Sequence, residues 1–128
     1  MIKKWTEFEG GPNRVKKDEL RVSLNSRGVM LLNRVAYAAL DKPGAVKLFF
    51  DEQNYIIGLK PVDPQRTNAF PVKRKDKYEN CTIHAMPFCR HFAITVERTV
   101  LFHEVDIDNE GVMTLPLKKT ITIGKAVG

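Results

Sequence analysis

Residues 21–62 read RVSLNSRGVMLLNRVAYAALDKPGAVKLFFDEQNYIIGLKPV. Apolar and polar residues alternate at the start of this stretch, where Val22 and Leu24 share one face, and an apolar run follows at 29–32. The letters Ser-Arg-Gly between the two segments are typical of a tight turn. The beginning of the stretch therefore predicts two antiparallel strands joined by a turn.

The rest of the same stretch predicts a short helix and a hairpin. Asn33 is a suitable N-cap for a helix over 34–40. The Pro-Gly pair at 43–44 ends this helix, because proline disfavours helical geometry in the residue before it. The apolar runs at 45–50 and 55–62 flank the polar letters DEQN, which indicates a hairpin. The predicted order is strand, strand, short helix, strand, strand.

A similar order follows in the second half of the chain. CTIHA at 81–85 predicts a strand, and MPFCRHFAI at 86–94 predicts a short helix with a proline in its first turn. The runs at 99–107 and 111–117 predict a second hairpin, and TITIG at 120–124 predicts an edge strand. Each repeat is too small to bury its apolar face alone, so we expect two such units to share one core, either as a tandem in one chain or as a dimer.

The core predicted from these patterns draws on both repeats. From the first repeat it contains Val22, Leu24, Leu31, Ala36, Leu40, Val46, Leu48, Ile57 and Leu59. From the second repeat it contains Ile83, Phe88, Phe92, Ile94, Leu101, Val105, Met113 and Leu115.

Composition places the chain among soluble globular proteins. Its 128 residues are 43% hydrophobic and 28% charged, and no apolar run is long enough to cross a membrane. The first residues do not resemble a secretory signal, and two cysteines do not form a disulfide framework, so we expect a cytoplasmic protein with reduced thiols. We divide the chain into an N-terminal arm (1–20), a first repeat (21–62), a basic linker (63–79) and a second repeat with a C-terminal strand (80–128).

The net charge of +6 is unevenly distributed. The region 14–42 is rich in basic residues, a compact basic cluster occupies 73–77, and the region 97–110 is acidic. Lysines and arginines bind the phosphates of nucleic acids by releasing counterions. The candidate nucleic-acid-binding residues are Arg21, Arg27, Arg34, Lys73, Arg74, Lys75 and Lys77.

The stretch 21–62 also resembles the swapped-hairpin module of SpoVT/AbrB-type and MraZ-type bacterial DNA-binding proteins. Gly28 lies at the position of the family's turn glycine, Leu40 at its helix-end leucine, and Leu59-Lys60-Pro61 at its hairpin exit. The resemblance implies a mainly β, barrel-like fold with short helices, in which two strand-strand-helix-hairpin repeats form a swapped-hairpin or cradle-loop barrel in an MraZ-like tandem. The related double-psi barrel is the alternative topology.

The same resemblance implies a function. We expect a small DNA-binding protein that acts as a transcriptional regulator or antitoxin-like repressor. It would bind double-stranded DNA as a homo-oligomer and would not associate with a membrane. The chain departs from the family pattern at Val29, where a basic residue is usual, and at Asn33, where a proline is usual. These departures favour the alternative of a protein-interaction module on an AbrB-like barrel that has lost its DNA contacts.

Two groups of residues suggest other chemistry. Residues 81–91, CTIHAMPFCRH, contain two cysteines and two histidines, as a metal site could. In a strand, however, Cys81 and His84 face opposite sides, and in a helix Cys89 and His91 lie about 200° apart, so we interpret this stretch as a strand-to-helix passage. We expect no catalytic residue, metal or cofactor. The remaining possibility is a barrel enzyme with a divalent-metal site on Glu104, Asp106 and Asp108.

Overall fold

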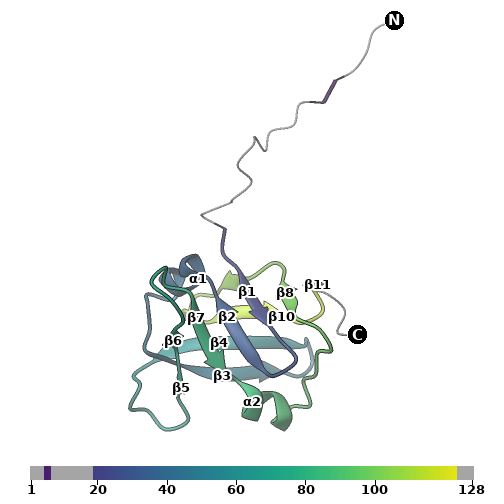
Figure 1. Cartoon of the computed structure of the whole chain (residues 1–128). Helices are drawn as coiled ribbons and strands as arrows, with labels where there is room; N and C mark the ends of the chain where they lie inside the picture. Colours follow the sequence, from purple (N-terminus) through teal and green to yellow (C-terminus); the bar gives the residue numbers. More distant parts are fainter. Residues whose placement is uncertain (1–4, 7–18, 124–128) are drawn as a thin grey trace, which may run out of the picture.

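Two antiparallel β-sheets and two short helices make up the computed structural model of the protein, which describes residues 5–6 and 19–123 (Figure 1). The first sheet has the strand order β11-β8-β1-β2-β7-β6 and the second has the order β5-β3-β4-β10-β9. The first sheet contains β1 (Val22–Leu24), β2 (Val29–Leu32), β6 (Lys73–Arg74), β7 (Cys81–His84), β8 (Val100–Phe102) and β11 (Thr120–Thr122). The second sheet contains β3 (Ala45–Asp51), β4 (Ile56–Val62), β5 (Phe70–Pro71), β9 (Asp106–Ile107) and β10 (Met113–Pro116).

The two helices lie at opposite ends of the pair of sheets (Figure 1). Helix α1 (Arg34–Ala39) follows β2, and α2 (Met86–His91) follows β7. The side chain of Asn33 accepts a hydrogen bond from the backbone N–H of Ala36 at 2.9 Å, which confirms the predicted N-cap. Pro87 lies in the first turn of α2, where its missing N–H costs no helical hydrogen bond. None of the described helices is long and apolar enough to span a lipid bilayer.

The mainly β character of the fold is confirmed, but the described residues do not form a closed barrel. The strands divide into two separate hydrogen-bonded sheets. Strands from the two halves of the chain pair directly in each of them, β2 with β7 in the first sheet and β4 with β10 in the second. The two halves therefore build both sheets jointly and do not form separate units.

The segment 63–79, expected to be a basic linker, carries the chain from one sheet to the other. Its strand β5 pairs with β3 at the edge of the second sheet, and β6 pairs with β7 at the edge of the first. Between them, the backbone N–H of Val72 donates a hydrogen bond to the carbonyl oxygen of Gly44 at 2.9 Å.

The second predicted hairpin is present only in a shortened form. Strands β9 and β10 pair around a turn at 108–111, as expected. The preceding strand β8 instead lies in the first sheet, between β1 and β11. Glu104 has a φ of 58°, which interrupts the extended backbone after β8 and directs the chain to the other sheet. The predicted edge strand at 120–124 is confirmed over Thr120–Thr122 as β11, and position 124 lies outside the described residues.

The core lies between the sheets, and most predicted core residues line it. The prediction for β2 was wrong, because Met30 and Leu32 are fully buried while Leu31 is half-buried. Met30 lies opposite Leu24 in the register of β1 and β2, so these two side chains share the inner face. Leu48, Phe92 and Val105, also predicted to be buried, are half-buried and pack against the core, whereas Leu101 is half-buried on the outer face of the first sheet.

Candidate nucleic-acid interface

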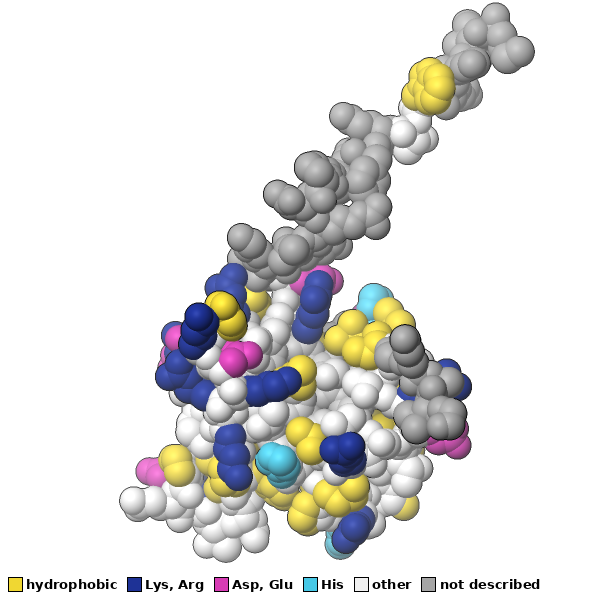
Figure 2. All heavy atoms as spheres, viewed as in Figure 1, with side chains coloured by type: hydrophobic (Ala, Val, Ile, Leu, Met, Phe, Trp, Pro, Cys, Tyr) yellow, Lys and Arg dark blue, Asp and Glu magenta, His cyan; other side chains and the backbone are white. Residues whose placement is uncertain are grey.

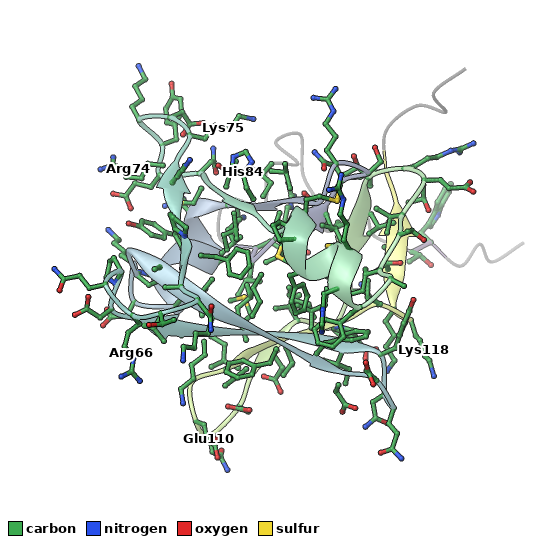
Figure 3. The ribbon with its side chains drawn as sticks, turned by 90° about the horizontal axis from the view of Figure 1, so that it is seen from below. Arg66, Arg74, Lys75, His84, Glu110 and Lys118 are labelled. Carbon is green, nitrogen blue, oxygen red and sulfur yellow. The ribbon has the colours of Figure 1, made fainter. Side chains whose placement is uncertain are left out.

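The four basic residues predicted at 73–77 lie on one hairpin. Lys73 and Arg74 form β6, and Lys75 and Lys77 lie in the turn that leads to β7. All four side chains are exposed. Figure 3 shows Arg74 and Lys75 near each other at one edge of the molecule, on the same side as His84, whereas Glu110 and Lys118 lie elsewhere.

Hydrogen bonds to Asp76 fix the conformation of this turn. The carboxylate of Asp76 accepts bonds from the backbone N–H of Tyr78 at 2.9 Å and from the side chain of Asn80 at 3.0 Å. These bonds hold the pKa of Asp76 below its usual value, and the bond from the Asn80 side chain contributes most. The ammonium of Lys77 lies 5.3 Å from the centre of the exposed Tyr78 ring. The turn therefore presents its cations and one aromatic ring from an ordered backbone.

Arg34 and Lys42 extend this basic surface to α1. The ammonium of Lys42 lies 3.0 Å from a carboxylate oxygen of Glu79, at the base of the β6–β7 hairpin. The hydrogen bond from Lys42 lowers the pKa of Glu79 most, and the charges of Lys42, Arg74 and Arg34 lower it further. One carboxylate is therefore in contact with Lys42, and the charges of Arg34 on α1 and Arg74 on β6 also act on it. Lys42 was not among the predicted site residues, because its sequence neighbours indicate only the end of a helix.

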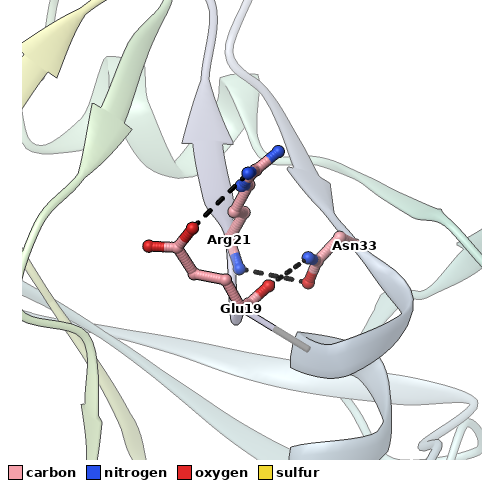
Figure 4. Close-up of polar contacts among 3 residues, drawn as sticks. All are labelled: Glu19, Arg21 and Asn33. Atoms are coloured by element: carbon pink, nitrogen blue, oxygen red, sulfur yellow. Dashed lines mark hydrogen bonds and ion pairs between the residues drawn. The ribbon is translucent and has the colours of Figure 1, made fainter. Parts of the chain in front are cut away.

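Arg21 lies beside the first turn of α1 (Figure 4). Its backbone N–H donates to the side-chain oxygen of Asn33 at 3.1 Å, and the side-chain amide of Asn33 donates to the carbonyl oxygen of Glu19 at 2.6 Å. The guanidinium of Arg21 lies 3.4 Å from the carboxylate of Glu19. Arg21, Asn33 and Asn80 line one hollow on the outer face of the first sheet. This hollow places Arg21 across from the base of the β6–β7 hairpin.

Arg27 is the predicted cation that the structure does not bring to this surface. It lies in the β1–β2 turn, at the end of the molecule that holds α2, whereas α1 lies at the other end (Figure 1). The side chain of Asn25 accepts a hydrogen bond from the backbone N–H of Arg27 at 2.9 Å, so the backbone of this turn is ordered while the guanidinium is exposed.

We call the six remaining predicted cations together with Lys42 the basic end of the molecule. Its members are Arg21, Arg34, Lys42, Lys73, Arg74, Lys75 and Lys77. Figure 2 shows Lys and Arg side chains over the upper left of one face, around α1 and β6, with acidic side chains among them. Because Glu19 and Glu79 pair with Arg21 and Lys42, the most available cations are those of the β6–β7 hairpin.

The structure separates the residues of the stretch 81–91, as the strand-to-helix interpretation predicts. Cys81 is fully buried, whereas His84 is exposed on the other face of β7. Cys89 is also buried, and both cysteines are free. Burial raises the pKa of both thiols above the ordinary cysteine value.

The acidic residues of the second half do not share one strand. Glu104 lies in the turn after β8, where its carboxylate contacts the ammonium of Lys119 at 2.6 Å. Asp108 accepts hydrogen bonds from the backbone N–H groups of Glu110 and Val112, at 2.8 and 3.0 Å. Within residues 5–6 and 19–123, no three His, Cys, Asp or Glu side chains are grouped so that they could hold a metal ion.

Comparisons of the chain with known protein families, with curated proteins and with solved structures find no match.

Proposed function

We propose that this chain is a small cytoplasmic DNA-binding protein that acts as a transcriptional regulator or antitoxin-like repressor, as a homo-oligomer. The observation that supports the proposal is the basic end, where cations from β6, its turn, α1 and the start of β1 come together. These residues are spread over positions 21 to 77 of the sequence, so folding is needed to assemble the surface.

The chemistry of the basic end suits a polyanionic backbone. Lysine and arginine side chains on phosphate oxygens supply affinity through counterion release, and contacts to base edges supply specificity. Asp76 and Glu79 lie in the β6–β7 hairpin itself, but among the described residues the ion pairs of Glu19 and Glu79 are with Arg21 and Lys42 and involve none of the four hairpin cations. We therefore assign Lys73, Arg74, Lys75 and Lys77 to phosphate contacts, with Arg21 and Arg34 beside them.

The proposal includes the arrangement of the two repeats in a swapped-hairpin or cradle-loop form. Two pairings support it. Strands β2 and β7, each followed directly by a short helix, pair with each other in antiparallel fashion. Strands β4 and β10, which end the two hairpins, also pair with each other. Corresponding elements of the two repeats thus meet in both sheets, as expected when two incomplete units share one core.

A DNA titration at two salt concentrations tests the proposed function. We expect the chain to bind a labelled 30-base-pair duplex at about 50 mM salt and to lose at least tenfold in affinity at about 200 mM, because contacts to several phosphates release counterions. The corresponding single strand serves as the control for duplex recognition. Absence of binding at low salt, or an affinity that does not depend on salt, would contradict the proposal.

A protein-interaction module is the second candidate function, and one surface favours it. On the outer face of the first sheet, Ile121 is 51% exposed and Ile123 is 39% exposed, next to the half-buried Leu101. Apolar groups exposed together on a sheet are a common feature of protein interfaces. If this function is correct, Ile121→Ser should release a co-purifying protein, whereas loss of cations at the basic end should not.

A further inference from the structure

A cleft of 440 Å³ lies between the β1–β2 turn, α2 and the segment that follows α2. It is separate from the basic end, because the β1–β2 turn and α2 lie at the end of the molecule opposite α1 (Figure 1). Its volume is within the range of about 300 to 1,000 Å³ that is typical of small-molecule sites. The proposed DNA-binding function does not use it.

The floor of the cleft is apolar and the rim is polar. Leu24, Cys89 and Ile94 line it from the core side, and each is at most 5% exposed. Ser26, Arg90 and Thr95 line it from the solvent side, and all three are exposed. The cleft therefore offers an apolar surface to one part of a molecule and a polar surface to another.

Local backbone structure shapes the cleft walls. At the end of α2 the N–H of Ala93 donates to the carbonyl of Arg90 at 3.3 Å, and the N–H of Ile94 donates to that of Cys89 at 2.8 Å. This is the Schellman arrangement, and it sends Ile94 into the core. On the other wall the side chain of Asn25 accepts a hydrogen bond from the N–H of Val29 at 3.0 Å. Both walls are thus held by hydrogen bonds before any ligand arrives.

The charge at the rim is positive. Among the residues that the structure describes, the guanidinium of Arg90 has no acidic partner in any ion pair. Arg27 is exposed in the turn that forms the opposite wall. A cation at the edge of an apolar cleft favours a ligand with an anionic group, because the anion stays near solvent while the apolar part is removed from water.

We propose that this cleft binds a small amphipathic anion, with its apolar body on Leu24, Cys89 and Ile94 and its anionic group, a carboxylate or a similar acid, at Arg90. The apolar floor supplies affinity in proportion to the surface it covers. Arg90 supplies selectivity for the anion over a neutral or cationic molecule of the same shape.

Three probes of equal chain length test the proposal: octanoate, 1-octanol and octylammonium. Each is titrated into the ¹⁵N-labelled protein, and binding is measured from amide chemical shifts. We expect octanoate to bind most tightly, with shifts at Ser26, Thr95 and Val96. Shortening octanoate to hexanoate should weaken binding by about tenfold or more, since each methylene contributes about 0.8 kcal/mol when buried.

Variants of the cleft and a matched control elsewhere show whether the probes bind in this cleft. Arg90→Gln should weaken the binding of octanoate about threefold to fivefold and leave the binding of 1-octanol unchanged, since an exposed ion pair contributes modestly to affinity. Arg66→Gln, which removes the same charge from an exposed turn elsewhere, should change neither. Thr95→Trp, at the exposed rim, should block both probes without altering the core. Equal binding of the three probes, shifts confined to Ile121 and Ile123, or no binding at millimolar concentrations would each overturn the proposal.

Discussion

Gly28 packs directly against the backbone of Met86. A Cβ atom added to Gly28 would lie 2.7 Å from the Cα atom of Met86, closer than such atoms approach one another in proteins. Gly28 also has a φ of 74°, and its carbonyl oxygen accepts a hydrogen bond from the N–H of Ala85 at 2.8 Å. The β1–β2 turn therefore fixes the position of the first turn of α2.

This contact predicts that Gly28→Ala destabilises the protein strongly. The positive φ costs about 1 to 2 kcal/mol for alanine, and relief of the contact with Met86 costs about 1 to 3 kcal/mol more. Gly111→Ala is the matched control, because Gly111 has a φ of 79° but nothing lies within 4 Å of an added Cβ. Urea unfolding should show a clearly larger loss for Gly28→Ala. Equal losses would mean that only the backbone conformation matters.

The side chain of Asn33 ties the start of β1 to α1, and its removal should destabilise both. Asn33→Ala loses the helix cap and the bonds to Arg21 and Glu19, and we expect a cost of about 2 to 3 kcal/mol. Asn33→Asp keeps the accepting oxygen but cannot donate to Glu19, so it should lose less. Urea unfolding curves of the two variants check the order, and a larger loss for Asn33→Asp would contradict it.

Ala93 occupies a position that suits glycine, so Ala93→Gly should stabilise the protein. Ala93 has a φ of 55° at the end of α2, a conformation that glycine adopts without steric cost. We expect a gain of about 0.5 to 1 kcal/mol in the free energy of unfolding. Ala38→Gly, at an exposed position inside α1, is the control and should lose about 1 kcal/mol. A loss for Ala93→Gly would show that the strain at this residue is relieved elsewhere.

Local sequence signals predicted the elements of this fold well. The turn before Val29, the cap at Asn33 and the proline at 87 each determine a conformation within a few residues, and the structure has the expected turn, cap and helix start. The inner face of β2 was not predictable in the same way, because all four of its residues are apolar and show no alternation. Its orientation is set by pairing with β1 across the glycine turn.

Non-local pairing accounts for what the sequence did not predict. The position of β8 between β1 and β11 depends on a break at Glu104 that no proline or glycine marks. The contact of Lys42 with Glu79 joins residues 37 positions apart, so no local pattern indicates it. The same holds for the separation of Arg27 from the other candidate cations, since it depends on which end of the sheet each turn occupies.

The ion pair of Glu79 predicts a pH dependence of stability. Because the pKa of Glu79 is lower in the folded protein than in the unfolded chain, its contribution is present above the unfolded value near 4.5 and is lost as the pH falls through the folded value. Glu79→Gln should therefore reduce the loss of stability between about pH 6 and pH 3. Glu110→Gln, which alters an exposed glutamate in the 108–111 turn, is the control. Identical pH profiles for wild type and Glu79→Gln would contradict the assignment.

Substitutions at the basic end should weaken DNA binding and make the affinity less dependent on salt. Arg74→Gln and Lys75→Gln should each reduce the affinity for duplex DNA about threefold to tenfold and reduce the slope against salt by about one. Because both side chains are exposed, neither substitution should change stability by more than about 0.5 kcal/mol. Fluorescence anisotropy at several salt concentrations measures both the affinity and the slope.

Three further substitutions test whether the affinity for DNA depends on the basic end or only on the net charge of the protein. Arg66→Gln and Lys118→Gln remove one charge each from exposed positions outside the basic end, and Arg27→Gln removes one from the opposite end of the molecule. If phosphates contact the basic end, these variants should lose less than twofold in affinity, since a distant charge is largely screened beyond about 10 Å at 0.1 M salt. Equal losses for all five variants would mean that DNA binds without a defined surface. A loss at Arg27 alone would move the interface to the β1–β2 turn, beside the cleft lined by Arg90.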